Sequence, residues 1–319
     1  MAQASFPADA EKIVFVSPYN KPYINLALED DILNNYPFTN VCMLYINSQA
    51  VVWGKNQVPW RECRPELLSC KGILPVRRFS GGGAVYHDTG NINFSFIGDE
   101  AHVGNYLGLV IKTLRDMGVD AVQGEDSDIL VNGYKISGGA HAYKHKRALH
   151  HGTLLVNSNI EKLRFFLKGI QGRFETPAVS SRPNKVACIE RPTYSTLQAF
   201  VKSISGKWNA EIFSAEGLRS DNAEYHRWLS KKAAYYAKDT WLYRDGPKFN
   251  CYVKDPWGKK AVFKVKKGRI IEIETFDNTL VSLFKGCNFG LREMRILCEK
   301  NGLKEKYAYW LDSVFGVDG

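Results

Sequence analysis

The sequence has no long apolar run and few, scattered cysteines, and each shortage excludes a class of protein. In 319 residues no hydrophobic stretch reaches the roughly 18–20 residues that a transmembrane helix needs. The seven cysteines include no Cys-x-x-Cys pair, so neither a zinc ribbon nor the disulfide framework of a small secreted protein is expected. We therefore expect a soluble folded protein with reduced thiols and no membrane partner.

Composition and charge narrow the choice of partner. Hydrophobic residues make up 45% of the chain, which is enough to bury one large domain or two unequal ones. The formal net charge is +10, and a basic balance attracts an anionic cofactor or an acidic protein surface. The short basic tracts contain no interleaved aromatics of the kind that stack on bases. Nucleic acid is therefore not the expected partner.

Hydrophobic periodicity predicts a mixture of helices and strands. Tyr23–Asn34 spaces apolar residues four apart with acids on the other side, as an amphipathic helix does, and Asn91–Ile97 alternates like a strand with one buried face. Asn132-Gly133 is a strong hairpin turn, because both residues tolerate positive φ. The same periodicity predicts strands at Ile13–Val16, near Val76, and at Ser127–Val131, Tyr134–Ser137 and Gly152–Val156, a hairpin of Met43–Ile46 with Ala50–Trp53, and helices at Tyr106–Met117 and through most of residues 192–239.

A turn-forming Asp-Gly-Pro within Arg244–Lys248 indicates a linker. Beyond it, strands at Ala261–Val265 and Ile270–Thr275 precede a helix at Leu291–Lys300. The chain is therefore predicted to form a large domain over residues 1–246 and a small α+β domain over residues 247–319.

The most informative stretch is the arginine- and glycine-rich run Arg77–Asp88, which reads RRFSGGGAVYHD. Three consecutive glycines let the backbone approach a ligand closely, and their N–H groups can receive an anion or a carbonyl oxygen. A bare triple glycine would suit a mobile surface loop equally well, but the two arginines and the Val-Tyr-His-Asp flank favour a ligand loop. The spacing fits neither the phosphate loop of nucleoside triphosphatases nor the Rossmann fingerprint.

Two further stretches carry polar groups beside glycines. Lys135 precedes Gly138, and a lysine there could act as a point charge over a phosphate or a developing oxyanion. Taken alone, however, this pattern favours an ordinary surface lysine after a hairpin turn. His150 and His151 open the run HHGTLL. Six of the seven histidines lie between His87 and His151, yet His141 and His145 enclose no glutamate in the zinc-protease position. No metal site is expected.

Taken together, these three stretches resemble the lipoate–protein ligase A family. The resemblance also covers Asn25–Glu29 and Val52–Gln57 and runs in order through most of residues 10–250, and the tail resembles the family's small accessory domain. Within the family the likeness is greatest to the mitochondrial lipoyltransferases of vertebrates. The resemblance implies an α/β (α+β, mixed-sheet) catalytic domain like that of biotin– and lipoate–protein ligases, plus a small C-terminal α+β domain.

The resemblance also implies an activity and its partners. The expected reaction moves a lipoyl (or octanoyl) group from lipoyl-AMP to a lysine of an acceptor protein, namely the lipoyl domains of 2-oxoacid dehydrogenase E2 subunits and the glycine cleavage H protein. The expected location is the mitochondrial matrix, with this chain as the mature form, and the expected state is a monomer. Mg²⁺ is expected only if an ATP-dependent activation step is present.

Carried over by position, the resemblance makes Lys135 the catalytic residue, in contact with the acyl-adenylate near its phosphate and carbonyl. The residues that it implies for binding lipoyl-adenylate are Arg77, Ser80, Gly81, Gly82, Gly83, Val85, His87, Asp88, Asp128, Gly138, His151 and Thr153. A mixed anhydride is already activated, so the enzyme has only to align the incoming amine and stabilise charge, without a covalent nucleophile.

The sequence departs from the bacterial ligases of this family at one informative place. It has Glu125-Asp126-Ser127-Asp128 where they commonly carry Arg-Asn-Asp, and Phe79 where they often have serine. Loss of a cation and an amide near the nucleotide suggests that the chain accepts preformed lipoyl-AMP and performs only the transfer.

Three alternatives stay open at this stage. The first is a complete ATP-dependent lipoate–protein ligase with the same fold and site. The second is a thioester-using transferase, although no cysteine lies between Cys70 and Cys188 to serve it. The third is a lipoyl-domain binder without activity, for which Lys135 and the triple glycine would be idle.

Overall fold

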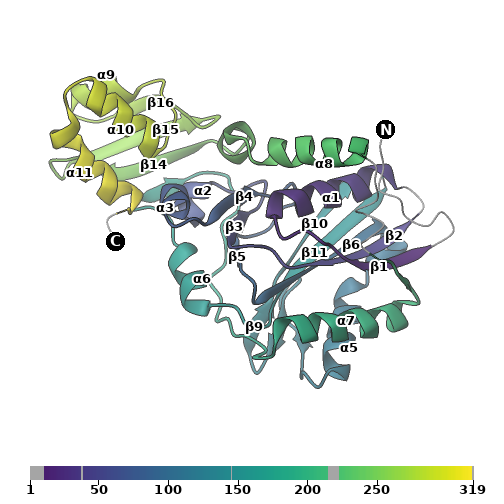
Figure 1. Ribbon diagram of the computed structural model, residues 1–319. Coiled ribbons are helices and arrows are strands. Elements are labelled where there is room, and N and C mark those ends of the chain that lie inside the picture. The colour runs from purple at the N-terminus through teal and green to yellow at the C-terminus, as the bar shows by residue number, and fades with distance from the viewer. Residues whose placement is uncertain (1–10, 37–38, 145, 215–222, 318–319) are drawn as a thin grey trace.

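A six-stranded mixed sheet organises the larger part of the molecule in this computed structural model, which describes residues 11–36, 39–144, 146–214 and 223–317 (Figure 1). The strand order is β10 (Gly139–Lys144), β11 (Arg147–Leu155), β6 (Asn91–Asp99), β2 (Asn40–Tyr45), β1 (Lys12–Val16) and β13 (Glu211–Ile212). The β1 strand pairs in parallel with β2 and β13, and the other neighbours are antiparallel. Residues 1–10, His145 and part of the predicted helical stretch 192–239 lie outside the described residues.

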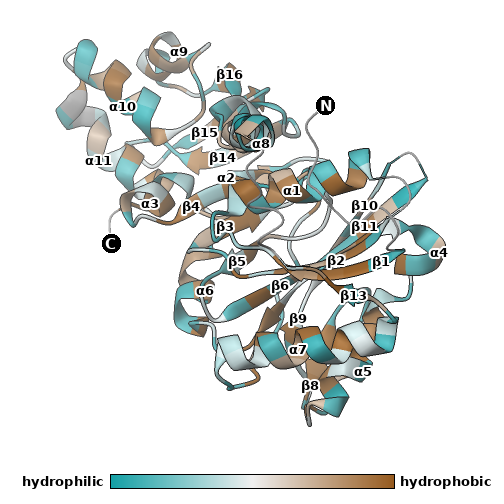
Figure 2. Ribbon diagram, turned by 45° about the vertical axis from the view of Figure 1, so that its right-hand side comes forward, coloured by the Kyte–Doolittle hydropathy of each residue, from teal (hydrophilic) through white to brown (hydrophobic). Residues whose placement is uncertain are grey.

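Helices cover both faces of this sheet. On one side lie α1 (Pro22–Asn35) and α8 (Ala223–Tyr236), and on the other lie α5 (Tyr106–Asp116) and α7 (Thr193–Trp208) (Figure 1). Coloured by hydropathy, the sheet shows brown apolar segments between helices whose outer surfaces carry teal polar ones (Figure 2). In the described part of the chain, no helix is long and apolar enough to cross a membrane.

This double cover corrects two predictions about burial. The strand Asn91–Ile97 is present within β6, but it is buried on both faces rather than one. The helix Tyr23–Asn34 is present as α1, but its acids do not face water, because Glu29 and Asp31 are 0% and 1% exposed. Asp31 is covered by Tyr225 of α8, and Glu29 faces the large sheet, where Tyr45 and His151 contact its carboxylate. A pattern read within one helix does not reveal these contacts.

Two small sheets accompany the large sheet. The first has the order β4 (Leu74–Arg77), β3 (Ala50–Trp53), β5 (Val85–His87), and the second has β7 (Val122–Gln123), β8 (Ile129–Val131), β9 (Tyr134–Ser137). The Asn132-Gly133 turn joins β8 to β9 with both φ angles positive, as predicted. The predicted hairpin of β2 with β3 is wrong, because these strands lie in different sheets. Both strands are fully buried, so no polar face specifies their pairing.

The C-terminal part forms a second body around its own core. Its sheet has the order β12 (Arg173–Glu175), β14 (Phe249–Lys254), β15 (Lys260–Lys266), β16 (Arg269–Glu274), and it packs against α9 (Asn278–Phe284), α10 (Leu291–Lys300) and α11 (Lys304–Phe315). The strand β12 and the buried Trp60 contribute to this body from far upstream of residue 247. A π-helix, η2 (Thr240–Arg244), leads from α8 into it.

Four short helices complete the fold. They are α2 (Pro59–Glu62), α3 (Pro65–Cys70), α4 (Glu100–Val103) and α6 (Ile160–Phe166). The α2 and α3 helices lie beside the C-terminal body (Figure 1). The buried carboxylate of Glu66 in α3 accepts a hydrogen bond from the Leu291 amide at the start of α10, at 3.0 Å. The C-terminal body is thus held directly to the part of the chain that follows β3.

Candidate active site

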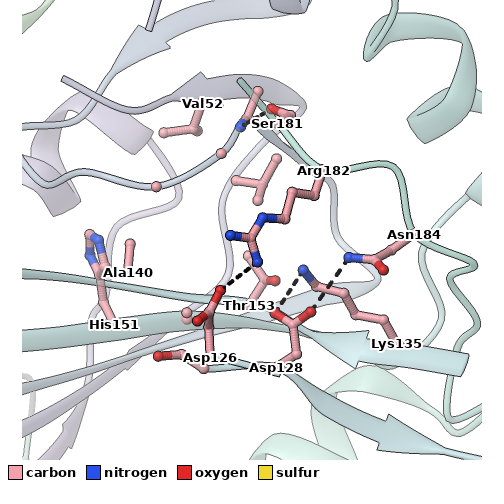
Figure 3. Close-up of a pocket in the computed structure, with 18 of the residues that line it drawn as sticks. Val52, Asp126, Asp128, Lys135, Ala140, His151, Thr153, Ser181, Arg182 and Asn184 are labelled. Carbon is pink, nitrogen blue, oxygen red and sulfur yellow. Dashed lines mark hydrogen bonds and ion pairs between the residues drawn. The ribbon is translucent and has the colours of Figure 1, made fainter. Parts of the chain in front are cut away.

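A cavity of about 740 Å³ opens between the large sheet and the small sheets, within the range of roughly 300–1,000 Å³ typical of ligand sites. Its walls come from α1, β11, the glycine-rich loop, the β8–β9 hairpin and residues 179–185. Figure 3 shows Val52, Ala140 and His151 on one side, and Asp128 and Lys135 with other charged groups on the other. The cavity therefore has one mainly apolar end and one charged end.

Lys135 and Asp128 form an ion pair at the charged end. The β8–β9 hairpin brings them together, with Nζ 2.8 Å from the Asp128 carboxylate (Figure 3). The backbone of Lys135 is fixed as well, because its N–H donates to the Lys185 carbonyl at 2.8 Å and its own carbonyl accepts from the Ala187 amide at 3.1 Å. An ammonium group has three donors, so Lys135 can hold Asp128 and still donate to a ligand.

Gly138 leaves the space that the Lys135 side chain occupies. A Cβ atom at position 138 would lie 2.9 Å from Lys135 Cε and 3.0 Å from Nζ. The Gly138 carbonyl also accepts from the Thr153 amide at 3.1 Å, which joins the lysine hairpin to β11. The glycine at this position therefore sets where the ammonium group can lie.

Replacing Gly138 by alanine is expected to displace the ammonium group and slow acyl transfer by roughly 10–10²-fold, since a small misplacement of a catalytic group is costly. The matched control is Gly206→Ala in α7, where an added Cβ meets nothing within 4 Å. Transfer rates of both variants, measured by the mass of an acceptor protein, test this. Equal rates for the two variants would contradict the role given to Gly138.

The glycine-rich loop folds around the buried guanidinium of Arg78. Arg78 donates to the carbonyls of Val52 at 3.2 Å and Gly83 at 2.7 Å, and also to that of Gly81. Gly82 has φ +81°, and a Cβ there would lie 2.9 Å from the Arg78 guanidinium. Within the described residues, nothing accepts a hydrogen bond from the amides of the three glycines. Gly82 and Gly83 line the cavity, so their amides can receive a ligand.

Arg77 corrects a prediction, because the structure places it away from the cavity. Neighbouring residues of a strand point to opposite sides, so Arg77 at the end of β4 faces η2 while Arg78 faces the cavity. The Arg77 guanidinium is 1% exposed and donates to the carbonyls of Trp241, Lys55 and Asp245. It also stacks on the Trp241 ring at 4.9 Å. Its contacts join the start of the glycine-rich loop to η2 and to Asp245, which follows η2.

The prediction that Asp88 binds lipoyl-adenylate is corrected in the same way. Its carboxylate accepts from the amides of Gly90 and Asn159, each at 2.9 Å, and it does not line the cavity. A short acid after β5 is used here to hold the turn into β6, as Asx turns do.

A buried chain of contacts links Ser80 to Glu29 through His151. The Ser80 hydroxyl lies 2.7 Å from His151 Nε2, and His151 Nδ1 lies 3.1 Å from Glu29 Oε1. Burial alone would raise the pKa of Glu29, but the charge and hydrogen bonds of His151 and the hydroxyls of Ser95 and Tyr45 together lower it. The order of these three residues resembles a Ser-His-acid triad. However, Ser80 is 1% exposed, and its hydroxyl accepts a hydrogen bond from Arg78 Nε at 3.0 Å. We therefore assign Ser80 to holding the loop.

His87 lines the cavity next to Asn47, whose side-chain amide lies 3.0 Å from Nδ1. Burial, together with the nearby Arg78 and His151, lowers the pKa of His87 to about 3. The ring is therefore neutral at physiological pH.

This shift predicts how stability depends on pH. The unfolded chain takes up a proton on His87 near the ordinary pKa of 6.5, while the folded chain does not until about pH 3. The free energy of unfolding should therefore fall as pH drops below 6.5. His150 acts in the same direction. We expect the melting temperature to drop between pH 7 and pH 5, and to drop less in a His87→Gln variant. An equal drop in both proteins would contradict the shift assigned to His87.

The structure thus brings most of the predicted site together. Lining the cavity are Lys135, Gly82, Gly83, Val85, His87, Asp128, Gly138, His151 and Thr153. Ser80 and Gly81 lie behind this lining and contact Arg78, while Arg77 and Asp88 belong to other parts of the framework. Sequence reasoning missed Arg78 as a cavity residue, although the arginine pair was the available signal.

It also missed the segment of residues 179–185, which has no periodicity to identify it. Ser181 accepts from the Ala84 amide at 2.8 Å and from the Gln57 side chain at 3.1 Å, so this segment lies against the glycine-rich loop. Arg182 contacts Asp126 at 2.9 Å and Asn184 approaches Asp128 at 3.5 Å (Figure 3). Only the folded chain brings these residues to the cavity.

Comparison with known proteins decides the family. Residues 21–207 match the model of the lipoyl protein ligase A/B catalytic domain. The chain belongs to this family. Lipoate–protein ligase 1 of Staphylococcus aureus and lipoate–protein ligase LplJ of Bacillus subtilis are each 32% identical to it. These matches cover 82% and 81% of this chain and 84% and 82% of the relatives.

Solved structures agree on the fold. The structure of Plasmodium falciparum LipL1 in complex with lipoate superposes with a TM-score of 0.62 at 24% identity, over 94% of this chain and 99% of that one. A lipoate–protein ligase A bound with ATP gives 0.59 at 21% identity, over 73% and 98%. The predicted family and the mixed-sheet lipoate–protein ligase fold with a C-terminal domain are thus confirmed. This member of the family is a lipoyl-transferring enzyme.

Proposed function

We propose that this protein transfers a lipoyl group from lipoyl-AMP to a lysine of an acceptor protein. The observation that carries the proposal is the place of Lys135 at the charged end of a cavity whose other end includes the apolar side chains of Val52 and Ala140. An acyl chain suits the end near Val52 and Ala140, and a nucleotide phosphate suits the end near Lys135 (Figure 3). Two related solved structures, one in complex with lipoate and one bound with ATP, support this direction.

The residues divide the work of the reaction. The apolar end holds the acyl chain, and the Lys135 ammonium donates to the anhydride where its carbonyl and phosphate oxygens meet. The acceptor amine forms a bond to the carbonyl carbon, the bond from that carbon to the phosphate oxygen breaks, and AMP leaves with the electron pair. The new amide nitrogen releases its surplus proton. The enzyme contributes alignment and charge, so no acyl-enzyme bond is needed.

The charges at the polar end support a transferase without the activating half-reaction. Lys135 is paired with Asp128 at 2.8 Å, and Arg182 with Asp126 at 2.9 Å. Glu125 adds a third carboxylate to the same wall. Sites that bind a nucleoside triphosphate neutralise its phosphates with unpaired cations and Mg²⁺. Here Lys135 and Arg182 already have carboxylate partners, and Lys185, which also lines the cavity, has none among the described residues. One cation without a partner suits the single phosphate of an adenylate better than a triphosphate. Mg²⁺ enters our proposal only if the activation step is present.

Two parallel incubations test this proposal. One contains the protein, an apo acceptor domain and lipoyl-AMP, and the other contains lipoate, ATP and Mg²⁺ in place of lipoyl-AMP. We expect the acceptor to gain the mass of one lipoyl group only in the first. Modification in both would make the protein a complete lipoate–protein ligase, and modification in neither would overturn the transfer itself.

The proposed acceptors are the lipoyl domains of 2-oxoacid dehydrogenase E2 subunits and the glycine cleavage H protein. The enzyme is proposed to act on them as a monomer in the mitochondrial matrix. One related solved structure is that of an archaeal lipoylation system, a bipartite lipoate–protein ligase and its E2 lipoyl domain from Thermoplasma acidophilum. With a net charge of +10, the chain should attract an acidic acceptor over distance. We expect the transfer rate at limiting acceptor to fall as salt is raised, and a flat response would contradict this steering.

The thioester alternative lacks a suitable thiol among the described residues. None of the cysteines there lines the cavity, and burial raises the pKa of Cys188, whose thiol donates to the Ser158 carbonyl. A thiol of this kind is a poor nucleophile. Cys188→Ala should therefore leave the transfer rate unchanged, and an inactive variant that still folds would revive the alternative.

A further inference from the structure

A chain of four buried polar side chains runs from the start of α1 to the cavity. It consists of Ser17, Asn25, Asn47 and His87, which are 7%, 0%, 2% and 5% exposed. The Ser17 hydroxyl lies 2.6 Å from Asn25 Oδ1, Asn25 Nδ2 lies 2.8 Å from Asn47 Oδ1, and Asn47 Nδ2 lies 3.0 Å from His87 Nδ1. Of these four residues, Asn47 and His87 line the cavity.

The direction of these hydrogen bonds is fixed by a backbone carbonyl. Asn25 Nδ2 also lies 3.0 Å from the Tyr19 carbonyl, which can only accept, so this atom is the amide nitrogen. Asn25 therefore donates to the Asn47 side-chain oxygen, and Asn47 in turn donates to His87. It follows that His87 Nδ1 is the acceptor and that Nε2 carries the ring proton.

At the acyl end of the cavity, the ring proton on His87 Nε2 has no hydrogen-bond acceptor among the described residues. There, Arg78 donates to loop carbonyls, His151 contacts Ser80 and Glu29, and Tyr45 donates to Glu29. By contrast, no acceptor contacts His87 Nε2 within the residues that the structure describes. His87 lies near Arg78 and His151, and Figure 3 shows His151 on the side of the cavity away from Lys135.

We propose that Asn25 and Asn47 are positioning residues that hold His87 as a hydrogen-bond donor toward the tail of the acyl chain, so that the site prefers lipoyl to octanoyl. This rests on the proposed function of the same cavity. A lipoyl tail ends in two sulfur atoms, which are weak acceptors, whereas an octanoyl tail ends in a methyl group. A methyl group would leave the donor buried and unsatisfied, so we expect a preference of roughly tenfold.

The test is a competition between lipoyl-AMP and octanoyl-AMP for one apo acceptor domain, read as the ratio of the two products. The informative variant is Asn47→Asp, because a carboxylate has only acceptors to offer and draws the His87 proton to Nδ1. The matched control is Asn105→Asp, the same change at an exposed residue before α5. His87→Leu removes the donor and gives a second variant if the first does not fold.

Nitrogen NMR of the full chain, labelled at histidine, shows directly which ring nitrogen of His87 carries the proton. If Asn47 had only a structural role, its replacement would not change the position of this proton. We expect the proton on Nε2 in the wild type and the Asn105→Asp control, and on Nδ1 in Asn47→Asp, with the product ratio of both His87-directed variants falling to about one. A wild-type ratio of one, a proton on Nδ1 in the wild type, or a preference that survives both variants would overturn the inference.

The failure of the proposed function looks different. If neither adenylate modifies the acceptor, the transfer proposal fails, but dissociation constants for free lipoate and octanoate still decide the inference. Tighter binding of lipoate in the wild type, lost in His87→Leu, would uphold it. Equal binding of the two acids would overturn it.

Discussion

Replacing Lys135 by alanine is expected to slow lipoyl transfer from lipoyl-AMP by roughly 10²–10³-fold, the loss that follows removal of one donor to a developing oxyanion. The ammonium group is held by Asp128 and by the space at Gly138, and no second lysine takes this place in the hairpin. Transfer rates at saturating lipoyl-AMP measure the effect. The fold should survive, since a partly exposed ion pair contributes no more than about 1 kcal/mol.

The matched control is Lys112→Ala, which removes an exposed lysine on the outer side of α5. It should transfer at the wild-type rate and melt at the wild-type temperature. If Lys135→Ala also retains the full transfer rate, the catalytic role assigned to this lysine is wrong.

The second large effect distinguishes the roles of the neighbouring residues Arg77 and Arg78. Arg77→Met should lower the free energy of unfolding by about 3–5 kcal/mol, because it leaves the carbonyls of Lys55, Trp241 and Asp245 without their buried donor. Chemical denaturation measures this loss. Arg77 does not line the cavity, so the folded fraction of the variant should still bind lipoyl-AMP with wild-type affinity.

Arg78→Met should instead weaken binding of lipoyl-AMP and slow transfer by roughly 10²-fold, because the glycine-rich loop loses the group around which it folds. Its stability falls as well, since Glu29 loses a nearby positive charge. Binding of lipoyl-AMP, measured for both variants, distinguishes the two residues. A loss of binding in Arg77→Met that exceeds the loss in Arg78→Met would reverse the assignment made from the structure.

Local patterns predicted the elements whose cause is local. The predicted helix near Leu291–Lys300 is α10. The α5 helix ends at Asp116, two residues before Gly118, whose φ of +75° is one that glycine adopts readily. The Asn132-Gly133 turn is correct for the same kind of reason. In each case the signal lies within a few neighbouring residues, so the sequence is sufficient.

Pairings between distant segments could not be predicted in this way. The β2 and β3 strands are close in sequence but belong to different sheets, and β12 joins the C-terminal sheet from a position far upstream of it. The burial of Asp31 depends on α8, whose Tyr225 contacts the Asp31 carboxylate from almost two hundred residues further along the chain. Contacts of this kind are decided by packing of the whole chain rather than by periodicity.

The candidate site shows the same division. The triple glycine and Lys135 were recognisable because they occur in order with the HHGTLL run, a combination that resembles the lipoate–protein ligase A family. The assignment of Arg77 rather than Arg78 to the cavity was wrong because a motif gives positions but not the side of the strand that each residue faces. The contribution of residues 179–185 came only from the structure.

The central claim is tested most directly by the mass of an apo lipoyl domain incubated with this protein and lipoyl-AMP alone, followed by mapping of the modified residue. Our account predicts the addition of one lipoyl group, on one acceptor lysine, at a rate that greatly exceeds the rate without enzyme. An acceptor whose mass is unchanged, or whose modification is equally fast without the protein, would contradict it.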